Sequence, residues 1–229
     1  MQKVAIFGGT FDPIHWGHLL IAQTALDRLG LDRVIWVVDR SPPHKQLSTQ
    51  LNFQYRWEMV QLAIADRPAF ILPDITTKSP GHSYAIETLT HLQAVYPQTH
   101  WHWIVGQDAF ATLPRWYRRQ ELIPECDWLV APRPEGSNIE LELLCKTVVE
   151  QLATQSIPIC WQVLSVPPVA ISSSLIRQYC QQNRSIRYLV PEAVRTYILN
   201  QQLYQSPGFD VSDFGVNAQS NAQPNVPSP

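Results

Sequence analysis

The most informative part of this chain is the stretch VAIFGGTFDPIHWGH, residues 4 to 18. It opens on a strand-like apolar run, continues through Gly8 and Gly9, and leads into a helix that we expect to begin near Gly17. Glycine has no Cβ, so the backbone at the two glycines admits a ligand at close range. The unpaired N–H groups and the positive dipole end of a helix start attract anions. The stretch therefore predicts the anion-binding corner of an α/β protein.

Two histidines within this stretch favour a phosphate ligand. His15 and His18 are three residues apart, so they project to the same side at a helix entrance, where two imidazole N–H donors suit a polyphosphate. A metal is the alternative, but the sequence places no third ligand nearby and catalytic zinc normally takes three, so we assign no metal ligand. The chain also lacks GxGxxG, which disfavours a dinucleotide cofactor, and GxxxxGK(S/T), which excludes a P-loop.

Strand-like runs and helix-period segments alternate outward from this stretch, as in parallel strands joined by helical crossovers. Right-handed crossovers make such a chain a doubly wound, mainly parallel sheet of the α/β class, with ligands at the carboxyl ends of the strands. The predicted strands are Val4 to Phe7, Val34 to Val38, Phe70 to Pro73, His102 to Val105, Trp128 to Ala131 and Trp161 to Val166.

Five helices are predicted between and after these strands. Two are expected late, one after Ser172 and one with Pro191 in its first turn. The other three show apolar residues at helical spacing. These residues are Leu19, Ala22, Leu26 and Leu29 before a stop at Gly30, then Phe53, Trp57, Val60 and Ile64 after an N-cap at Asn52, then Ile86, Leu89 and Leu92 in a helix starting near Ser83.

Composition excludes several classes of protein. The 229 residues suffice for one domain with a good core. With 17 Lys and Arg against 19 Asp and Glu, the chain has a formal charge of −2 and lacks the cationic excess of a polybasic nucleic-acid binder. Its strongest apolar run, Val34 to Val38, is far shorter than the roughly 18 to 20 residues of a membrane-spanning helix. The opening MQKVAIFGG is too short for a signal peptide, so we expect a cytoplasmic protein.

Residues 206 to 229 differ in character from the rest of the chain. They hold four prolines, many Asn, Gln and Ser and no cation, which predicts a disordered, low-complexity tail after a domain of residues 1 to 205. The cysteines show no CxxC spacing, so we interpret them as reduced thiols rather than as a zinc or disulfide framework. They are Cys126, Cys145, Cys160 and Cys180.

A second stretch, ISSSLIR at residues 171 to 177, also suits phosphate. It places serines where a helix would begin, with Arg177 one turn after Ser173. Hydroxyls and free amides at a helix tip, with a guanidinium on the same face, make a fork for phosphate oxygens. On its own such a helix is ordinary, but its pairing with the first stretch favours a nucleotide site.

The two stretches together resemble the nucleotidylyltransferase superfamily, whose signatures are an HxGH element after the first strand and an ISSTxIR element near the C-terminus. Ser174 stands where the superfamily usually has Thr. Further segments are similar to one branch, the bacterial nicotinate-mononucleotide adenylyltransferases. They are SPPHK at 41 to 45, HSYAIETL at 82 to 89, VGQDAF at 105 to 110, LPRWY at 113 to 117 and LVPEAVRTYI at 189 to 198.

The resemblance implies an enzyme with a Rossmann-like fold that transfers AMP from ATP to nicotinate mononucleotide, giving deamido-NAD and pyrophosphate. It implies that His15, His18 and Arg177 are catalytic and hold the ATP phosphates, with Mg²⁺ bound to those phosphates. The ATP-binding residues that it implies are Gly8, Gly9, Thr10, Phe11, Lys45, Gly106, Asp108 and Ser173. The residues that it implies for nicotinate mononucleotide are Ala85, Trp116 and Tyr117.

Some alternatives stay open at this point. Ala85 stands where members of the branch often have Thr, so preference for nicotinate over nicotinamide is undecided. Other hypotheses are an adenylyltransferase for another phosphate monoester and a nucleotide-binding regulator without turnover. The sequence is also compatible with a homo-oligomer.

Other conspicuous side chains are interpreted as structural. His100 and His102 alternate on one strand face, where we expect a structural or solvent-facing role. The tryptophans at 101, 103 and 128 are expected in the core. The arginines at 115, 118 and 119 form either a solvated helix face or a cluster that steers an anionic acceptor.

Overall fold

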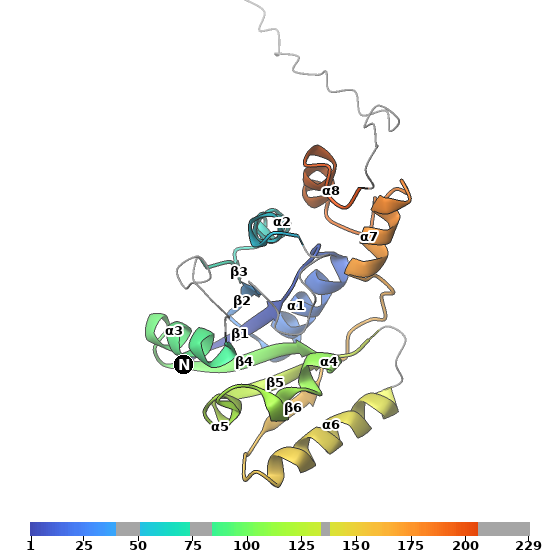
Figure 1. The fold of residues 1–229 in the computed structure, drawn as a ribbon. Helices are drawn as coiled ribbons and strands as arrows, with labels where there is room; N and C mark the ends of the chain where they lie inside the picture. Colours follow the sequence, from blue (N-terminus) through green and yellow to red (C-terminus); the bar gives the residue numbers. More distant parts are fainter. Residues whose placement is uncertain (40–50, 74–83, 134–137, 206–229) are drawn as a thin grey trace, which may run out of the picture.

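Six parallel strands form one sheet, in the order β3-β2-β1-β4-β5-β6 (Figure 1). The computed structural model describes residues 1–39, 51–73, 84–133 and 138–205. All neighbouring strands pair in parallel, which confirms the predicted α/β sheet. The strands are β1 (Gln2–Gly9), β2 (Arg33–Val38), β3 (Phe70–Ile71), β4 (Thr99–Gly106), β5 (Cys126–Ala131) and β6 (Cys160–Val163).

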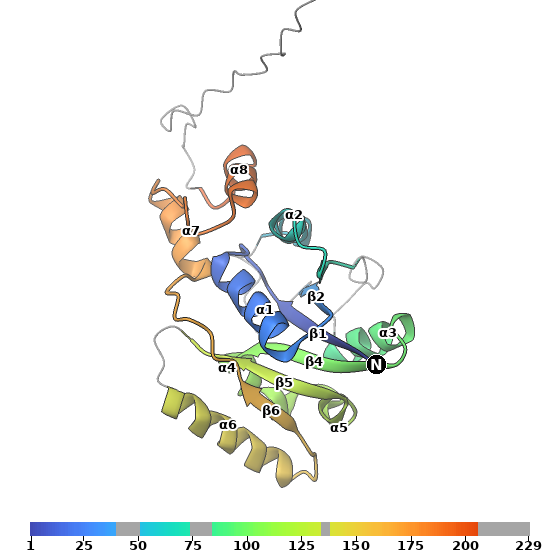
Figure 2. The same ribbon diagram turned by 180° about the vertical axis from the view of Figure 1, so that it is seen from behind.

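Helices cover both faces of the sheet, as Figures 1 and 2 show from opposite sides. One buried cluster packs α1 (Trp16–Leu29), α2 (Phe53–Ile64), α7 (Ser173–Gln181) and α8 (Glu192–Asn200) on the first face. A second cluster packs α3 (Ala85–Val95), α4 (Gln107–Phe110), α5 (Arg119–Leu122) and α6 (Asn138–Ala153) on the other face. Two short 3₁₀ turns, η1 (Leu113–Arg115) and η2 (Ile123–Glu125), flank α5.

The alternation of side chains along β1 explains the two layers. Ala5 and Phe7 belong to the first cluster, whereas Val4 and Ile6 belong to the second. Successive side chains of a strand point to opposite faces, so a strand with helices on both sides is apolar at every position. Val4 to Phe7 therefore reads as a continuous apolar run because β1 lies in the middle of the sheet.

The residues that we predicted to mark helix ends lie at helix ends in the structure. Helix α1 ends at Gly30, which takes up the left-handed conformation with φ of 59°. The side chain of Asn52 accepts a hydrogen bond of 3.1 Å from the backbone N of Gln54 and caps α2. Ser172 caps α7 in the same way through the backbone N of Leu175. Pro191 lies one residue earlier than expected, at the N-cap of α8.

The longest helix, α6, was not predicted. Its buried residues are Leu141, Cys145, Val148 and Leu152, at spacings of 4, 3 and 4, so the helical period was present in the sequence. Ile139 and Leu143 lie on the outer side of α6 and are exposed, which blurs the pattern. The short α4 and α5 were also not predicted.

The sheet order places a topological switch at β1 and β4. Chain connections run from β1 toward β2 and β3 on one side, and from β4 toward β5 and β6 on the other. Ligands of doubly wound sheets bind beside such a switch, at the carboxyl ends of the strands. A ligand-binding site is therefore expected between the loop after β1 and the segment after β4.

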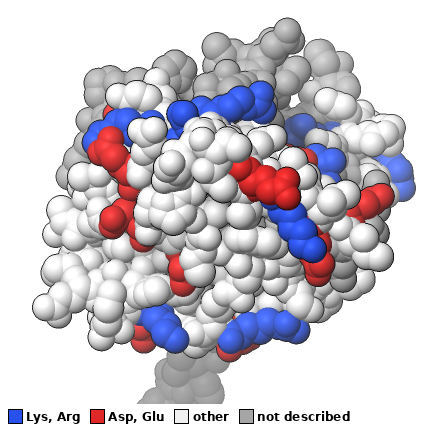
Figure 3. All heavy atoms as spheres, turned by 90° about the horizontal axis from the view of Figure 1, so that it is seen from below, with Lys and Arg blue, Asp and Glu red and all other residues white. Residues whose placement is uncertain are grey.

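Charges of both signs are interspersed on the face shown in Figure 3. Among the described residues drawn there, neither sign gathers into a continuous patch. A search of the helices in the described ranges finds none that is long and apolar enough to cross a membrane. The expected tail, residues 206 to 229, lies outside the described residues, so the division at residue 205 stays a prediction.

Candidate active site

A cavity of about 510 Å³ opens at the carboxyl ends of β1, β4 and β5. Its size lies within the range of small-molecule sites, about 300 to 1,000 Å³. The end of β1, the loop after it and the start of α1 contribute Gly8, Gly9, Phe11, His15 and His18 to its wall. The end of β4, the start of α4 and the segment after β5 contribute Gly106, Asp108 and Arg133. Ile171, the first residue of the second motif, completes this wall. The structure therefore brings the two distant motifs to one cavity, at the expected switch point.

Phe11 shapes the loop that follows β1. Its φ of 48° is in the left-handed region, and its buried ring packs against Phe7, Trp36 and His18. A Cβ on Gly9 would lie 2.9 Å from the Cζ atom of Phe11. We expected the open side of Gly9 to admit a ligand, but the structure shows that the ring of Phe11 occupies it.

The imidazoles of His15 and His18 stack on each other. Their ring centroids are 3.7 Å apart and the planes differ by 25°. The backbone N of His15 donates a hydrogen bond of 3.3 Å to Nδ1 of His18. Because Nδ1 accepts, the neutral ring of His18 carries its proton on Nε2. A Cβ on Gly17 would come within 3.0 Å of two ring atoms of His15, which explains the glycine between the histidines.

Burial keeps both histidines uncharged at neutral pH. It lowers the pKa of His15 to about 4. Burial, and after it the neighbouring His15, lowers the pKa of His18 well below its usual value. A bound anion favours the charged form of a histidine, so a phosphate in this cavity would raise both pKa values.

Arg56 of α2 lies beneath the loop and was not recognised from the sequence. Only 1% of its surface is exposed. Its Nη1 donates to the carbonyl of Thr10 at 2.8 Å and its Nε to the carbonyl of Leu51 at 3.1 Å. Burial lowers the pKa of Arg56, whereas the carboxylates of Asp12 and Asp39 raise it. The arginine thus ties the loop to α2 and to two acidic groups.

The C-terminal part of the described chain also bonds the loop. Ser173 Oγ donates to the carbonyl of Pro13 at 2.8 Å, and Arg177 Nη1 donates to the carbonyl of Asp12 at 2.7 Å. Tyr204 donates its phenolic hydroxyl to Asp12 Oδ1, also at 2.7 Å. Four side chains, from Arg56 to Tyr204, therefore fasten residues 10 to 13.

The structure separates the predicted phosphate ligands into two groups. His15 and His18 line the cavity, whereas Arg177 is not part of its wall within the described residues. Both amino groups of Arg177 already have protein partners, since Nη2 donates to Ser174 Oγ at 3.2 Å. Thr10 and Ser173 are likewise not among the residues that line the cavity: the carbonyl of Thr10 accepts from Arg56, and Ser173 donates to the carbonyl of Pro13. Lys45 lies outside the described residues.

Gly106 and Asp108, for which the resemblance implies contact with ATP, both line the cavity. No atom is found within 4 Å of a Cβ built on Gly106, so this position is open. The carboxylate of Asp108 accepts hydrogen bonds from Arg133, whose Nε lies 3.0 Å from Oδ2. Arg133 is the second functional candidate that the sequence reading missed, although its position just after β5 follows the strand-end rule.

Tyr84, Ala85, Trp116 and Tyr117 form a group that we call the aromatic side. The rings of Tyr84 and Tyr117 are 4.5 Å apart, and Ala85 and Trp116 pack on the same buried cluster. The indole Nε1 of Trp116 donates to Thr112 Oγ1 at 2.9 Å, while Tyr117 is 54% exposed. The predicted acceptor residues therefore lie together, but they are not among the residues lining the described cavity.

The other side chains singled out in the sequence have the following surroundings. The tryptophans at 101, 103 and 128 are buried in the second cluster. His102 is buried and His100 exposed. Of the three arginines beside the aromatic side, Arg118 pairs with Glu121 and Arg119 bonds Gln155 Oε1 at 2.6 Å, so two of them have local partners. The four cysteines form no disulfide.

Comparison with known proteins defines the class first. A model of the cytidylyltransferase-like family matches residues 6–179. Among solved structures, nicotinic acid mononucleotide adenylyltransferase of Plasmodium falciparum complexed with NaAD shares the fold, with a TM-score of 0.70 and 18% identity over 89% of this chain and 98% of that one. The chain is a nucleotidyltransferase enzyme.

Closer relatives define the family. The chain is 56% identical to the probable nicotinate-nucleotide adenylyltransferase of Trichormus variabilis over 206 residues, covering 89% of this chain and 98% of the relative. It is 55% identical to the enzyme of that name from a Nostoc species, with the same coverage. The chain belongs to the nicotinate-nucleotide adenylyltransferase family.

Proposed function

We propose that this enzyme transfers AMP from ATP to nicotinate mononucleotide and releases pyrophosphate and deamido-NAD. The observation that carries the proposal is the cavity at the β1–β4 switch, where His15 and His18 meet the first residue of the ISSSLIR motif. Membership of the nicotinate-nucleotide adenylyltransferase family supports the choice of acceptor.

The chemistry of this transfer suits a site without a nucleophilic side chain. The 5′-phosphate of the acceptor has a second pKa of about 6, so it is mostly ionised at neutral pH and attacks without a general base. The pyrophosphate leaves as a stable anion. The enzyme must therefore align two anions that repel each other and stabilise the charge that develops on the phosphates.

His15, His18 and Arg133 are the side chains that we assign to this task. The two imidazoles are neutral at pH 7, and Nε2 of His18 carries a proton that it can donate to a phosphate oxygen. Arg133 is an exposed cation on the wall, and its partner Asp108 is available for a ribose hydroxyl once the pair separates. Arg177 acts on the loop through the carbonyl of Asp12, and this contact is the role we propose for it.

Mg²⁺ fits this cavity as an ion carried by ATP. Magnesium commonly takes one or two carboxylates together with substrate phosphates and water. Among the described residues of the wall, Asp108 is the carboxylate, and it is engaged by Arg133. The protein therefore supplies little of the coordination shell. When bound, the ion offsets phosphate charge, while the histidines orient the phosphates.

The aromatic side is the acceptor site in this proposal. Trp116 offers a half-buried indole for the pyridine ring. We assign the carboxylate of that ring to the backbone of Ala85 and Tyr117, which lie beside the packed rings of Tyr84 and Tyr117. Ala85 begins α3, so the amide at this helix start is placed to favour the negatively charged nicotinate over neutral nicotinamide. We propose that the reaction takes place in the cytoplasm, which suits membership of a family of metabolic enzymes.

A pyrophosphate-release assay with ATP and Mg²⁺ tests the proposal. Nicotinate mononucleotide, nicotinamide mononucleotide and phosphopantetheine are compared as acceptors at equal concentration. We expect the highest kcat/KM with nicotinate mononucleotide. Higher activity with another phosphate monoester would replace the assigned acceptor, and absence of pyrophosphate with all three would contradict the enzymatic role.

A further inference from the structure

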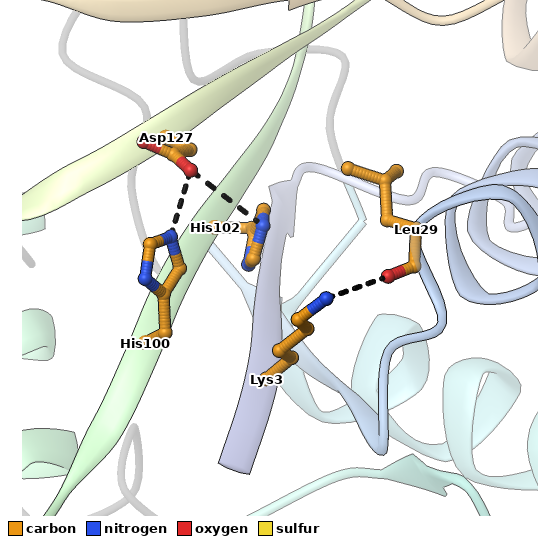
Figure 4. A network of polar contacts seen from close by, with 5 residues as sticks. All are labelled: Lys3, Leu29, His100, His102 and Asp127. Atoms are coloured by element: carbon orange, nitrogen blue, oxygen red, sulfur yellow. Dashed lines mark hydrogen bonds and ion pairs between the residues drawn. The ribbon is translucent and has the colours of Figure 1, made fainter. Parts of the chain in front are cut away.

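A second cluster of chemically active side chains lies far from the cavity, on β4 and β5. His100 and His102 are two residues apart on β4, so their side chains project from the same face of the sheet. Asp127 of β5 is the direct register partner of His102. Figure 4 shows the carboxylate of Asp127 turned toward both imidazoles. The adenylyl transfer proposed above uses none of these groups.

The distances between the three side chains suit a small metal ion. His100 Nε2 lies 2.7 Å and His102 Nε2 3.8 Å from Asp127 Oδ2, and the three ligand atoms are all within 4.8 Å of one another. Tetrahedral zinc with bonds of about 2.05 Å separates its ligand atoms by about 3.3 Å, which lies between the two measured distances. The gap between His102 and Asp127 is too long for a direct hydrogen bond.

We propose that His100, His102 and Asp127 form a binding site for a divalent transition metal of the zinc type. Two imidazole nitrogens and one carboxylate oxygen are a common donor set for zinc, with a fourth position left to water. Calcium and magnesium prefer all-oxygen sites, so they fit this set poorly. The proposal concerns residues outside the catalytic cavity and does not depend on the acceptor assigned above.

The proposed metal site is partly exposed to solvent, and neighbouring residues hold its ligands in place. The side chains of His100 and Asp127 are 46% and 30% exposed, whereas that of His102 is 5% exposed and anchors the cluster in the sheet. The thiol of Cys160, the register partner of Asp127 on β6, forms a hydrogen bond with its carboxylate and so orients it. A hydrogen bond of this kind to a metal-ligating side chain helps to fix the orientation of that side chain.

One cation lies near the cluster. Lys3 of β1 is the register partner of His100, and a free ammonium there would oppose a metal ion. Its Nζ is instead 3.5 Å from the carbonyl oxygen of Leu29 at the end of α1 (Figure 4). The ammonium is therefore held by a carbonyl at the end of α1, although its charge, after burial and His100, still helps to lower the pKa of the His102 imidazole.

The position of the cluster assigns a structural role to the metal. His100 and His102 lie in the first half of β4, whereas the catalytic cavity lies beyond its last residue, Gly106. An ion held by β4 and β5 would join two neighbouring strands at the edge remote from ATP. Its expected effect is on the stability of the sheet, with little effect on turnover.

Zinc titration of the full chain, freed of any affinity tag and first treated with a chelator, tests the proposal. Binding of Zn²⁺ is measured by competition with a chromophoric chelator for the wild type, His100→Ala, Asp127→Asn and the control His91→Ala. His91 is an exposed histidine on α3, away from the cluster. We expect one site in the wild type and the control, and affinity at least about tenfold weaker in the two cluster variants.

Thermal unfolding supplies the second readout. Zn²⁺ should raise the melting temperature of the wild type and of His91→Ala, and chelator should reverse the increase. The two cluster variants should unfold like the wild type without metal and show no increase with it. Equal zinc affinity in all four proteins, or no zinc binding by the wild type, would overturn the proposal.

Discussion

The two sides of the proposed active site differ in how firmly the chain holds them. The nucleotide side is the loop of residues 8 to 18, where side chains from α2, α7 and the residue Tyr204 bond the backbone or carboxylate of the loop. The aromatic side shows ring packing between Tyr84 and Tyr117, an indole hydrogen bond from Trp116 and a largely exposed Tyr117. The nucleotide side is therefore held in place by the chain itself, whereas the aromatic side offers an exposed surface on which the acceptor can pack.

This difference matches what each side has to do. Groups that stabilise developing charge act best when they are already in place, because no reorganisation is needed during the reaction. An acceptor ring is held by apolar contact and stacking, which tolerate small changes of position. Substitutions on the nucleotide side should therefore reduce stability or kcat, whereas those on the aromatic side should change the KM for the acceptor.

Arg56→Met should have the largest effect. It removes a buried cation that lies near Asp12 and Asp39 and bonds two carbonyls. Breaking a buried charge network costs about 3 to 5 kcal/mol, so we expect a loss of this size in the free energy of unfolding, measured with urea. Arg56→Lys, which keeps the charge, should lose less. The exposed Arg67→Met is the control, and an equal loss there would contradict the special role of Arg56.

His18→Ala should lower kcat by about 10² to 10³ with little change in the KM for nicotinate mononucleotide. The reason is that the imidazole donates to charge that grows during the reaction. Steady-state kinetics of pyrophosphate release measure both constants, and His91→Ala serves as the control. Turnover near that of the wild type would refute the assigned role.

The pH dependence of stability should reveal His15. Its pKa is about 4 in the folded chain and near 6.5 when unfolded, so between these values the unfolded chain binds a proton that the folded chain does not. Its contribution is present above pH 6.5, and the free energy of unfolding falls by up to ~3 kcal/mol as pH drops from 6.5 to 4. Urea titrations should show a shallower fall in His15→Gln. Parallel curves for the two proteins would place the pH dependence elsewhere.

Trp116→Ala should have the smallest effect, confined to the acceptor. Loss of the indole face should raise the KM for nicotinate mononucleotide about two- to tenfold, and leave the KM for ATP unchanged. Trp57→Ala, which removes a half-buried tryptophan from α2, is the control. If both Michaelis constants rise together, Trp116 supports the fold instead of the acceptor.

The fold was largely predictable because its signals are local. Parallel strands with both faces covered produce apolar runs such as Val34 to Val38, and Gly30 and Asn52 mark helix ends by their own chemistry. Helix α6 was missed because Ile139 and Leu143 add exposed apolar residues to an otherwise clear period. No local rule indicates that such residues will face water.

The site was predictable only in part, because several contacts depend on tertiary packing. The sequence indicates that His15, His18 and the ISSSLIR segment belong together, and the structure brings these segments to one cavity. The sequence does not indicate that Arg177 donates to the carbonyl of Asp12, because every residue type has a backbone carbonyl. The burial of Arg56 is equally invisible, because an arginine in an amphipathic helix normally faces solvent.

The bond between Tyr204 and Asp12 has a consequence for the making of the protein. It joins residues 192 positions apart in the sequence, so it cannot form on the ribosome until residue 204 has been added and has left the exit tunnel. A nascent chain that contains only β1 and α1 lacks all four side chains that bond residues 10 to 13. The nucleotide pocket thus gains the last of these supports only after residue 204 has emerged, long after the histidines of the loop have been made.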